Sequence, residues 1–541
     1  MNRKSICVLM LLLSGCAPLP PPPERPVPPL RIRRAPQKVG PEIRIGILSG
    51  MESVEFSADR DFVVSKTNGL VLASGTNRDR WKIQIRKARP AKMLYRLVAA
   101  SMSSMENARD QAQEIEAKGL GTAIESFPVN PDSQLPGADT LYRIYLKPVF
   151  ETYEDAKAFQ NSIEDRVETF LSPLVHERVE GSVELQNTGT GEKWAVAESV
   201  RIRGANITVY AVPVGEGYHW EHSEDLTYPQ TVEFNIGPEG KIAVVNVLPL
   251  ETYLQGVVPS EMHPGFPLEA LKAQAVAARS RVYNRIGENG HGADSFDFCD
   301  EVHCQVYSGL SRRTPMTDLA VEETAGQVLW YRSGVCDAVF GGMCGGHGED
   351  AQAAWGSQVD YLEGNWDGTG LRRYGRLNGE KDVRKWIDGS PPCWCNTTQK
   401  NSPTFFEYTR KYFRWQIGIG RSELTANLVQ AGYARIGSIR ELIPEQRGLS
   451  GRIIRLRIVG SDGETIIRGE LNIRKALSPQ TLWSSCFYVE KESGSFVLKG
   501  AGWGHGVGMC QTGAGQMAWK GKRYDAILRQ YYRGAHIRKL Y

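Results

Sequence analysis

One carboxylate in this sequence stands in a setting suited to acid–base chemistry. Glu261 follows an apolar run and lies between Pro259 and Pro264. The two prolines restrict the backbone on either side, so the carboxylate is held in a narrow range of positions. A fixed glutamate can donate a proton in one step of a reaction and accept one in the next. His263 is a rival proton carrier by position, and we rank it below Glu261.

A helix that begins after Pro267 is expected to position this carboxylate. Its buried stripe is predicted from apolar residues at three- and four-residue spacing, namely Leu271, Ala275, Ala278, Val282 and Ile286. The apolar run before Glu261 is expected to be a strand. Residues 251–286 therefore predict a strand, a turn that carries the carboxylate, and a helix.

Two cations lie on one side of the predicted helix. Lys272 and Arg279 are two turns apart, so both could reach Glu261 or an oxyanion of a substrate. The competing interpretation is a pair of ordinary surface cations whose stems lie along apolar surface.

A second group of residues has the atoms of a metal site. Cys299, His303 and Cys304, with His291 upstream, offer two thiolates and two imidazoles for a tetrahedral ion. The C-x-x-x-H-C spacing is not a common zinc pattern. A disulfide between Cys299 and Cys304, or simple packing of the thiols, remains a competing interpretation.

Near the C-terminus, residues 500–515 read G-A-G-W-G-H-G-V-G-M-C-Q-T-G-A-G. The alternating glycines let the backbone approach a neighbour closely and expose Trp503 and His505 on a turn. Trp503 could stack on a sugar, and His505 could bind a substrate or orient Glu261; both could equally be structural. The strand–helix alternation of a dinucleotide fold does not surround this run.

The N-terminus predicts export. Residues 1–16 combine Arg3 and Lys4, a short apolar run and a final L-S-G-C box, which resembles a bacterial lipoprotein signal that is cleaved before a lipidated Cys16. Residues 17–41 are proline-rich and predict an extended tether. Such a protein is expected in the cell envelope, anchored by lipid and facing the periplasm from the outer membrane.

Composition sets further bounds. The chain has 541 residues, too many for one core, and its net charge of +4 shows no concentrated basic stripe, which argues against a nucleic-acid partner. Outside Cys7 and Cys16, eight cysteines remain: Cys299, Cys304, Cys336, Cys344, Cys393, Cys395, Cys486 and Cys510. An even number permits disulfides in an exported protein.

Short alternating segments in residues 42–80 and again from residue 183 predict antiparallel strands. Between them, residues 81–175 twice repeat an aromatic-bearing strand followed by a helix. This block resembles the SPOR domain, a small sheet-plus-helices module that binds glycan strands lacking stem peptides, although a generic α+β insert would fit as well. Tyr95 and Tyr142 would then stack on sugar rings. The predicted fold class is α+β, a β-rich domain that carries this insert.

Three segments in order carry a second resemblance: L-P-L-E-T-Y-L-Q-G-V-V-P-S-E-M with L-K-A-Q-A-V-A-A-R-S, then F-C-D-E-V-H-C-Q-V-Y, then the glycine-rich run at residues 500–515. Together they resemble the stage II sporulation protein D (SpoIID) family of peptidoglycan lytic transglycosylases and amidase enhancers. The resemblance extends over residues 42–72 and 183–541 and implies a catalytic Glu261, with Lys272 and Arg279 at basic family positions. Tyr307 and Gln511, within these motifs, become substrate-binding candidates.

The resemblance implies cleavage of glycan between N-acetylmuramic acid and N-acetylglucosamine, with no cofactor required. It also implies a structural zinc at the Cys299 motif, since some members carry one. Cys344 and Cys510 depart from the small hydroxyl residues usual there, so a disulfide from either to Cys393 or Cys395 is conceivable.

Three functions remain open at this point. The first is a lipid-anchored lytic transglycosylase of peptide-free glycan. The second is a non-catalytic glycan-binding protein that activates a cell-wall amidase. The third, a zinc peptidase or amidase at the Cys299 motif, is weak because two thiolates leave an unusual and closed site.

Overall fold

The computed structural model describes residues 40–102, 104–128, 140–163, 166–167, 169–197, 199–286, 291, 294–368, 375–389, 391–399 and 402–541. The predicted leader with Cys16 and nearly all of the proline-rich tether lie outside these residues. Among the described helices, none has the length and apolar content needed to cross a membrane.

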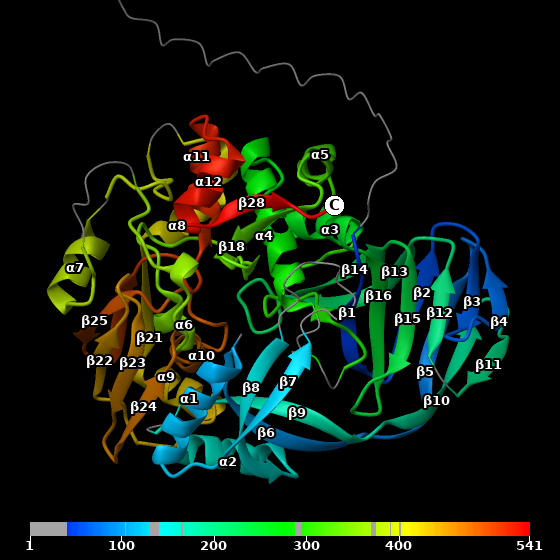
Figure 1. Cartoon of the computed structure of the whole chain (residues 1–541), viewed down its shortest axis with the longest axis horizontal. Coiled ribbons are helices and arrows are strands. Elements are labelled where there is room, and N and C mark those ends of the chain that lie inside the picture. The colour runs from blue at the N-terminus through cyan, green and yellow to red at the C-terminus, as the bar shows by residue number, and fades with distance from the viewer. Residues whose placement is uncertain are drawn as a thin grey trace, which may run out of the picture. The chain divides into compact units, whose positions relative to one another are not determined.

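Two mostly antiparallel sheets share one hydrophobic core (Figure 1). The seven-stranded sheet has the order β17 (Phe298–Cys299), β1 (Glu42–Met51), β16 (Ile242–Pro249), β15 (Thr231–Ile236), β12 (Val200–Arg203), β3 (Phe62–Lys66) and β4 (Val71–Gly75). The six-stranded sheet has the order β11 (Lys193–Val196), β10 (Glu180–Asn187), β5 (Arg80–Arg89), β2 (Ser53–Ala58), β13 (Ile207–Val214) and β14 (His222–Tyr228). Phe56 of one sheet contacts Phe234 of the other at 4.9 Å between ring centroids, which joins the sheets face to face.

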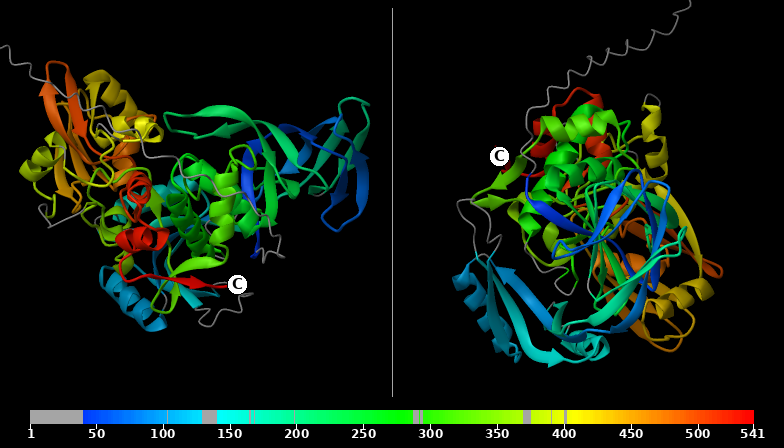
Figure 2. Two further views of the ribbon diagram at one scale, coloured as in Figure 1. Left: turned by 90° about the horizontal axis from the view of Figure 1, so that it is seen from above. Right: turned by 90° about the vertical axis from the view of Figure 1, so that its right-hand side faces the viewer.

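The insert forms a separate four-stranded sheet with its own core. Its strand order is β7 (Thr122–Pro128), β8 (Thr140–Phe150), β6 (Lys92–Met102) and β9 (Phe170–Glu177). Helices α1 (Met105–Ala117) and α2 (Tyr153–Ile163) cover one face of this sheet (Figure 2). The predicted start of the insert at residue 81 falls inside β5, which pairs with β2 and β10 of the surrounding domain.

The chain from Leu250 to Glu261 is a helix, α3, and the predicted strand there is wrong. Eight of its residues are buried, so its apolar content continues around the helix and the periodicity that marks a helix is lost. The second helix, α4 (Leu268–Arg285), is confirmed with its predicted buried residues from Leu271 to Val282. Glu261 therefore ends one helix and stands just before the next.

Helix α4 lies at the centre of a helical layer, in contact with elements that precede it and elements that follow it in the sequence. Its neighbours are α3, α5 (Pro315–Glu323), α11 (Gln511–Trp519), α12 (Tyr524–Tyr531), β18 (Gln327–Tyr331) and β19 (Gly334–Val335). Strand β18 also pairs with β28 (His536–Lys539) near the C-terminus.

The remaining C-terminal region packs around two further apolar clusters. Its sheets are β21 (Trp415–Gly420), β26 (Ser495–Gly500) and β25 (Phe487–Glu492), and β22 (Glu441–Arg447), β23 (Ile453–Val459) and β24 (Glu464–Arg468). Its longer helices are α7 (Glu380–Asp388), α9 (Arg421–Gln430) and α10 (Glu470–Leu477), with shorter α6 (Ala351–Trp355) and α8 (Arg410–Phe413). Parallel pairing of β20 (Phe340–Gly341) with β27 (Met509–Cys510) links it to α11. The β-rich α+β class is confirmed.

Candidate functional site

Glu261 is held by groups from two other parts of the chain. The backbone N–H of Val306 donates to Glu261 Oε1 at 2.7 Å, and Gln511 Nε2 donates to Oε2 at 3.3 Å. Gln511 also donates to Gln274 Oε1 at 3.4 Å, which ties α11 to α4. Three segments that are distant in the sequence thus meet at one carboxyl group.

The surroundings of Glu261 favour its protonated form. The residue is half-buried, and the withdrawal of its carboxyl group from water raises its pKa above the usual range. The bonds from Val306 and Gln511 and the charge of Arg281 act in the opposite direction. Because the pKa is raised overall, Glu261 meets one condition for a general acid, which must still hold its proton near neutral pH.

Val306 reaches Glu261 because Tyr307 lies against helix α3. A Cβ atom on Gly256 would stand 2.4 Å from the Tyr307 ring and 2.6 Å from the carbonyl oxygen of Gly309. The glycine therefore permits the approach of this segment. Tyr307 is 2% exposed and its hydroxyl donates to Asn246 Oδ1 at 2.7 Å. The prediction that Tyr307 binds substrate is wrong: its ring and hydroxyl are used inside the core.

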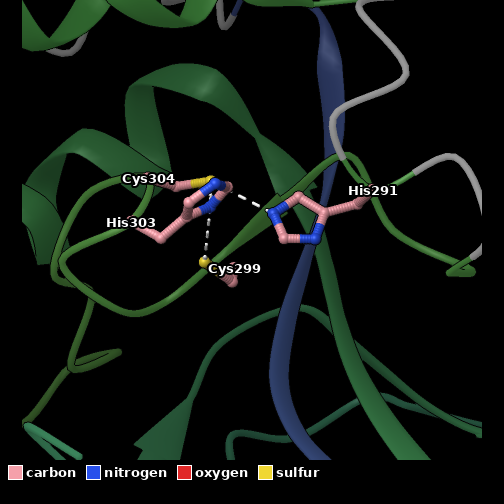
Figure 3. Close-up of side chains that lie close together, drawn as sticks. All are labelled: His291, Cys299, His303 and Cys304. Atoms are coloured by element: carbon pink, nitrogen blue, oxygen red, sulfur yellow. Dashed lines mark hydrogen bonds between the residues drawn. The ribbon is translucent and has the colours of Figure 1, made fainter. Parts of the chain in front are cut away.

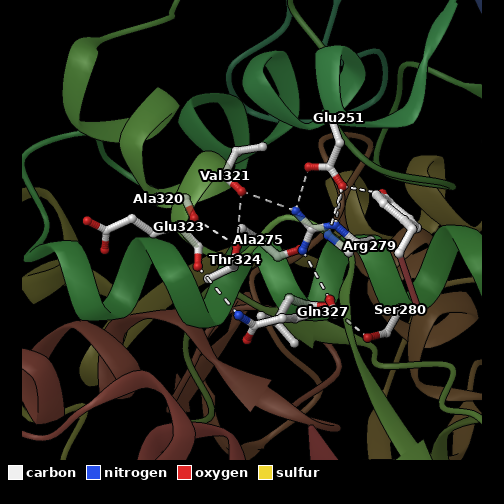
Figure 4. A network of polar contacts seen from close by, with 12 residues as sticks. Glu251, Ala275, Arg279, Ser280, Ala320, Val321, Glu323, Thr324 and Gln327 are labelled. Atoms are coloured by element: carbon white, nitrogen blue, oxygen red, sulfur yellow. Dashed lines mark hydrogen bonds and ion pairs between the residues drawn. The ribbon is translucent and has the colours of Figure 1, made fainter. Parts of the chain in front are cut away.

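Arg279 pairs with Glu251 and not with Glu261, contrary to the prediction. It is fully buried, and its Nε and Nη2 atoms each donate to Glu251 at 2.7 Å (Figure 4). Its Nη1 atom donates to the carbonyl of Gln327 at 3.1 Å. A buried guanidinium binds the nearest carboxylate with the right geometry, and here that carboxylate is Glu251.

Lys272 also has other partners. Its ammonium group lies 2.8 Å from Glu269 and 2.5 Å from Glu323. The predicted contact between the helix cations and Glu261 is therefore replaced by two ion-pair arrangements that hold α3, α4 and α5 together.

Three groups around Glu261 were not predicted from the sequence, namely Arg281, Gln274 and the N–H of Val306. Arg281, rather than Arg279 or Lys272, is the cation whose charge acts on Glu261, and its Nη1 donates to Asp337 at 2.8 Å. Gln274 is fully buried on α4. Gln274 could have been noticed in the sequence, because it is a glutamine within the alanine-rich stretch of a helix. The role of Val306 could not, because a backbone N–H does not depend on residue type.

His263 and His505 each use Nδ1 to accept a hydrogen bond from the backbone two residues further on. Nδ1 of His263 accepts from the N–H of Gly265 at 3.0 Å. Nδ1 of His505 accepts from the N–H of Val507 at 3.0 Å, and its Nε2 donates to the carbonyl of Phe340 at 3.1 Å. Burial lowers the pKa of His505 to about 3, so the imidazole is neutral. The predicted role of His505 with Glu261 is replaced by a structural one, in which the ring joins the glycine-rich run to β20.

Trp503 lies in an aromatic cluster assembled from separate segments. Its ring stacks on Tyr412 at 4.4 Å, and Trp220 and His219 approach it at 5.7 Å and 6.0 Å. Trp483 contacts Tyr412 at 5.0 Å. Trp220, Trp483 and Trp503 are half-buried and keep part of their ring surface accessible.

Tyr95 and Tyr142, predicted to stack on sugars, take part in packing. Tyr142 packs against the core of the insert, on the side of its sheet that the helices cover. Tyr95 is half-buried and contacts the Tyr153 ring of α2 edge-on at 5.9 Å. Arg96 lies over the ring of Tyr145 at 3.8 Å and pairs with Glu125.

His291, Cys299, His303 and Cys304 converge as predicted (Figure 3). Their ligand atoms all lie within 4.8 Å of one another. Nδ1 of His303 is 3.7 Å from Sγ of Cys299 and 3.4 Å from Sγ of Cys304, and Nε2 of His291 is 3.3 Å from Sγ of Cys304. Around a tetrahedral zinc ion, neighbouring sulfur and nitrogen ligands lie about 3.5 Å apart, given the usual bond lengths. The four side chains therefore fit zinc. Both thiols are free, and the alternative disulfide is not formed.

Comparisons with known proteins agree with this arrangement. The family model "Stage II sporulation protein" (SpoIID) matches residues 238–331, which hold α3, α4 and the Cys299 motif. An uncharacterized protein of Brachyspira hyodysenteriae is 31% identical over 54% of this chain and 68% of its own length. The chain belongs to the SpoIID family. Stage II sporulation protein D of Bacillus subtilis is 29% identical over 54% of the chain and 75% of its own length.

Two further family models match other parts of this SpoIID-family chain. The SPOR domain model matches residues 91–174, which confirms the nature of the insert. A domain of unknown function, DUF8618, matches residues 350–508. The amidase enhancer of Bacillus subtilis is 30% identical over 52% of the chain but only 40% of its own length. Together these matches support a function related to the cell wall, in the cell envelope.

A cavity of about 410 Å³ lies mainly in the DUF8618 segment. Its walls include Gln352, Gln358, Asn365, Trp366 and Arg376. Glu261 lies outside this segment, so the cavity and the candidate acid belong to different parts of the SpoIID-type chain.

Proposed function

We propose that this protein is a lytic transglycosylase of peptidoglycan and that Glu261 is its acid and base. The observation that carries the proposal is the half-buried carboxyl group at the meeting point of three family motifs, with a pKa raised by burial and anchors from Val306 and Gln511. The bond cleaved would join N-acetylmuramic acid to N-acetylglucosamine.

A single carboxyl group is sufficient for this reaction. Protonated Glu261 gives its proton to the glycosidic oxygen as the bond from that oxygen to the anomeric carbon of muramic acid breaks. The primary hydroxyl of the same muramic acid attacks the anomeric carbon, and the Glu261 carboxylate takes the hydroxyl proton. An anhydro ring forms, no water is consumed, and Glu261 regains its proton. Hydrolysis would instead require a second carboxylate to activate water or to form a covalent intermediate.

The anchors of Glu261 fit both halves of this cycle. Burial favours the neutral acid that begins the reaction, while the donors Val306 and Gln511 stabilise the carboxylate that exists after the first proton transfer. The two opposing influences leave the carboxyl group able to change its protonation state within the cycle.

Glycan binding is assigned to two regions. Partly exposed rings of the aromatic cluster, Trp220, Trp483 and Trp503, offer flat apolar surfaces for sugar rings. The SPOR domain would bind glycan strands that lack stem peptides and so concentrate the protein where the peptides have been removed. The partner is therefore peptidoglycan glycan, rather than a nucleic acid.

We further propose a structural zinc ion at His291, Cys299, His303 and Cys304. Two thiolates and two imidazoles would fill a tetrahedron and leave no position for a catalytic water, which disfavours a zinc peptidase. The ion would fix the loop that ends at Cys304. Val306, whose N–H donates to Glu261, follows two residues later. No step of the reaction passes through the metal.

Anchoring at Cys16 would hold the protein at a membrane of the envelope, and a bacterium with two membranes would place it at the outer one, facing the periplasm. Replacement of Cys16 by Ser is expected to release the full chain from the membrane fraction into the soluble envelope fraction. Retention of Cys16→Ser in the membrane fraction would contradict this assignment.

Digestion of purified peptide-free glycan strands, with mass analysis of the products, tests the reaction. We expect anhydro-muramic ends from the wild type and from Glu55→Gln, whose exposed carboxylate pairs with Arg80. Glu261→Gln is expected to lower the rate by about 10²- to 10⁴-fold, the range that general acid–base catalysis supplies. Products with added water would indicate hydrolysis, and an unchanged rate in Glu261→Gln would exclude this residue as the acid.

The second candidate function is enhancement of a separate cell-wall amidase. The similarity to the amidase enhancer of Bacillus subtilis favours it. Intact glycan after incubation with the wild type, together with equal stimulation of an added amidase by wild type and Glu261→Gln, would replace the transglycosylase with this function.

A further inference from the structure

A second cluster of metal-binding side chains lies in the C-terminal half, apart from the His291 cluster. Cys344, Asp367, Cys395 and Cys510 are all buried, and their ligand atoms lie within 4.8 Å of one another. They come from the segment after β20, from two neighbouring loops, and from the start of α11. The fold therefore brings four separate positions to one point in its interior.

The separations are those of ligands rather than of a disulfide. Sγ of Cys344 lies 3.6 Å from Sγ of Cys395 and 3.2 Å from Oδ2 of Asp367. A disulfide requires about 2.05 Å between sulfurs, and all the cysteines of the described chain are free. Two thiolates on a tetrahedral zinc ion lie about 3.8 Å apart, given zinc–sulfur bonds of about 2.3 Å.

Backbone donors already surround two of the sulfurs. Sγ of Cys510 accepts from the N–H of Cys344 and of Gly513, each at 3.3 Å. Sγ of Cys344 accepts from the N–H of Gly346 at 3.4 Å. Such donors stabilise a thiolate. Cys510 also lies at the N-terminal end of α11, where the helix dipole favours negative charge.

Asp367 is oriented as a carboxylate ligand would be. The Tyr531 hydroxyl donates to its Oδ1 at 2.8 Å, while Oδ2 faces Cys344. Metal-binding carboxylates are commonly held through the other oxygen in this way. A small cavity of about 20 Å³ borders Cys344, Asp367 and Tyr531.

We propose that Cys344, Asp367, Cys395 and Cys510 form a second metal site that holds one thiophilic divalent cation, zinc. Binding displaces the three thiol protons and forms three metal–sulfur bonds and one metal–oxygen bond. The four anionic ligands outweigh the ion by two charges. Arg414 offsets part of this excess, because its guanidinium donates to the carbonyl of Gly345, the residue after Cys344.

The site explains how so many thiols persist in a protein of the cell envelope. Cys393 adds a further sulfur 3.9 Å from Cys395. Thiols this close outside the cytoplasm tend to form disulfides, and coordination protects them. The ion would also fix Cys510, whose neighbour Gln511 binds Glu261; this last consequence rests on the proposed function, whereas the metal site does not.

Zinc content of the purified full chain tests the proposal. We expect two zinc ions per chain in the wild type and one in Cys510→Ser and Cys344→Ser. Cys299→Ser should lose the ion of the other cluster and keep this one. Cys486→Ser is the matched control, because this buried thiol bonds to the carbonyl of Ser450, outside the cluster, and it should keep both ions.

Cobalt titration of the wild type gives a second measurement that needs no variant. Two cobalt ions per chain are expected, with thiolate-to-cobalt absorption from five sulfur bonds, two in the first cluster and three in this one. Asp367→Asn, a substitution of equal shape, should keep the fold and release the second ion at a lower chelator concentration. The proposal is overturned if the wild type binds one ion that Cys510→Ser retains, or if mass analysis finds Cys344 or Cys510 in a disulfide.

Discussion

The buried pair of Arg279 and Glu251 gives a direct test of whether Arg279 is structural or catalytic. Arg279→Met removes two charged hydrogen bonds of 2.7 Å each and leaves Glu251 buried without its cation. Breaking a buried pair by removal of one partner costs about 3–5 kcal/mol. Two hydrogen bonds to charged groups, at about 1.5–3 kcal/mol each, give a sum of the same size.

Glu251 keeps some partners in this variant. The N–H of Gly326 donates to it at 3.3 Å, and the hydroxyl of Tyr541 also donates to it. These contacts place the expected loss in the lower part of the range, about 3 kcal/mol. The double variant Arg279→Met with Glu251→Met removes both charges, so it should be less destabilised than the sum of the single variants.

Urea unfolding, followed by tryptophan fluorescence and far-ultraviolet circular dichroism, measures these free energies. Arg80→Met is the matched control, because it breaks an exposed pair with Glu55 and should cost at most about 1 kcal/mol. The remaining folded Arg279→Met protein should still cleave glycan at low temperature. If Arg279→Met unfolds like Arg80→Met yet loses cleavage, Arg279 acts in the reaction and the structural reasoning is refuted.

Three further predictions concern the site itself. Because burial raises the pKa of Glu261 in the folded state, the charged carboxylate opposes folding once the pH exceeds the unfolded value of 4.5. Glu261→Gln should therefore melt at or above the wild-type temperature at pH 7 but show no gain at pH 4; a lower melting temperature at pH 7 would contradict the raised pKa. Gly256→Ala would place a methyl group against the Tyr307 ring. This variant should lose about 1–3 kcal/mol of unfolding free energy and cleave glycan more slowly. If its stability and rate equal those of the wild type, this contact does not hold Val306 in place. Removal of zinc by a chelator should lower the melting temperature of the wild type more than that of His303→Ala, and an equal response would argue against a structural ion at this motif.

The sequence identified several site residues from their chemistry alone. Glu261 stood out because prolines restrict its backbone. Gln511 was a substrate-binding candidate from the family motifs, and the structure instead joins it to Glu261 by a hydrogen bond. His291, Cys299, His303 and Cys304 are close in sequence and carry ligand atoms, so their convergence could be predicted from the residues.

Other roles depended on which distant segments meet. Arg279 lies on the predicted helix, but the carboxylate it binds, Glu251, was decided by the packing of α3 on α4. Tyr307 and His505 had suitable side chains for a site, yet burial gave their polar atoms internal partners. Residue type restricts what a side chain can do, and the tertiary structure chooses among those possibilities.

The sequence by itself indicated the family, the β-rich α+β class, an inserted domain at residues 81–175 and the acid candidate Glu261, because motifs and periodic apolar positions are local properties of the chain. Only the tertiary structure decided that α3 is a helix, that Val306 anchors Glu261, and that Cys344, Asp367, Cys395 and Cys510 converge. A buried polar group must find a partner wherever the fold places one, and that partner can be hundreds of residues away.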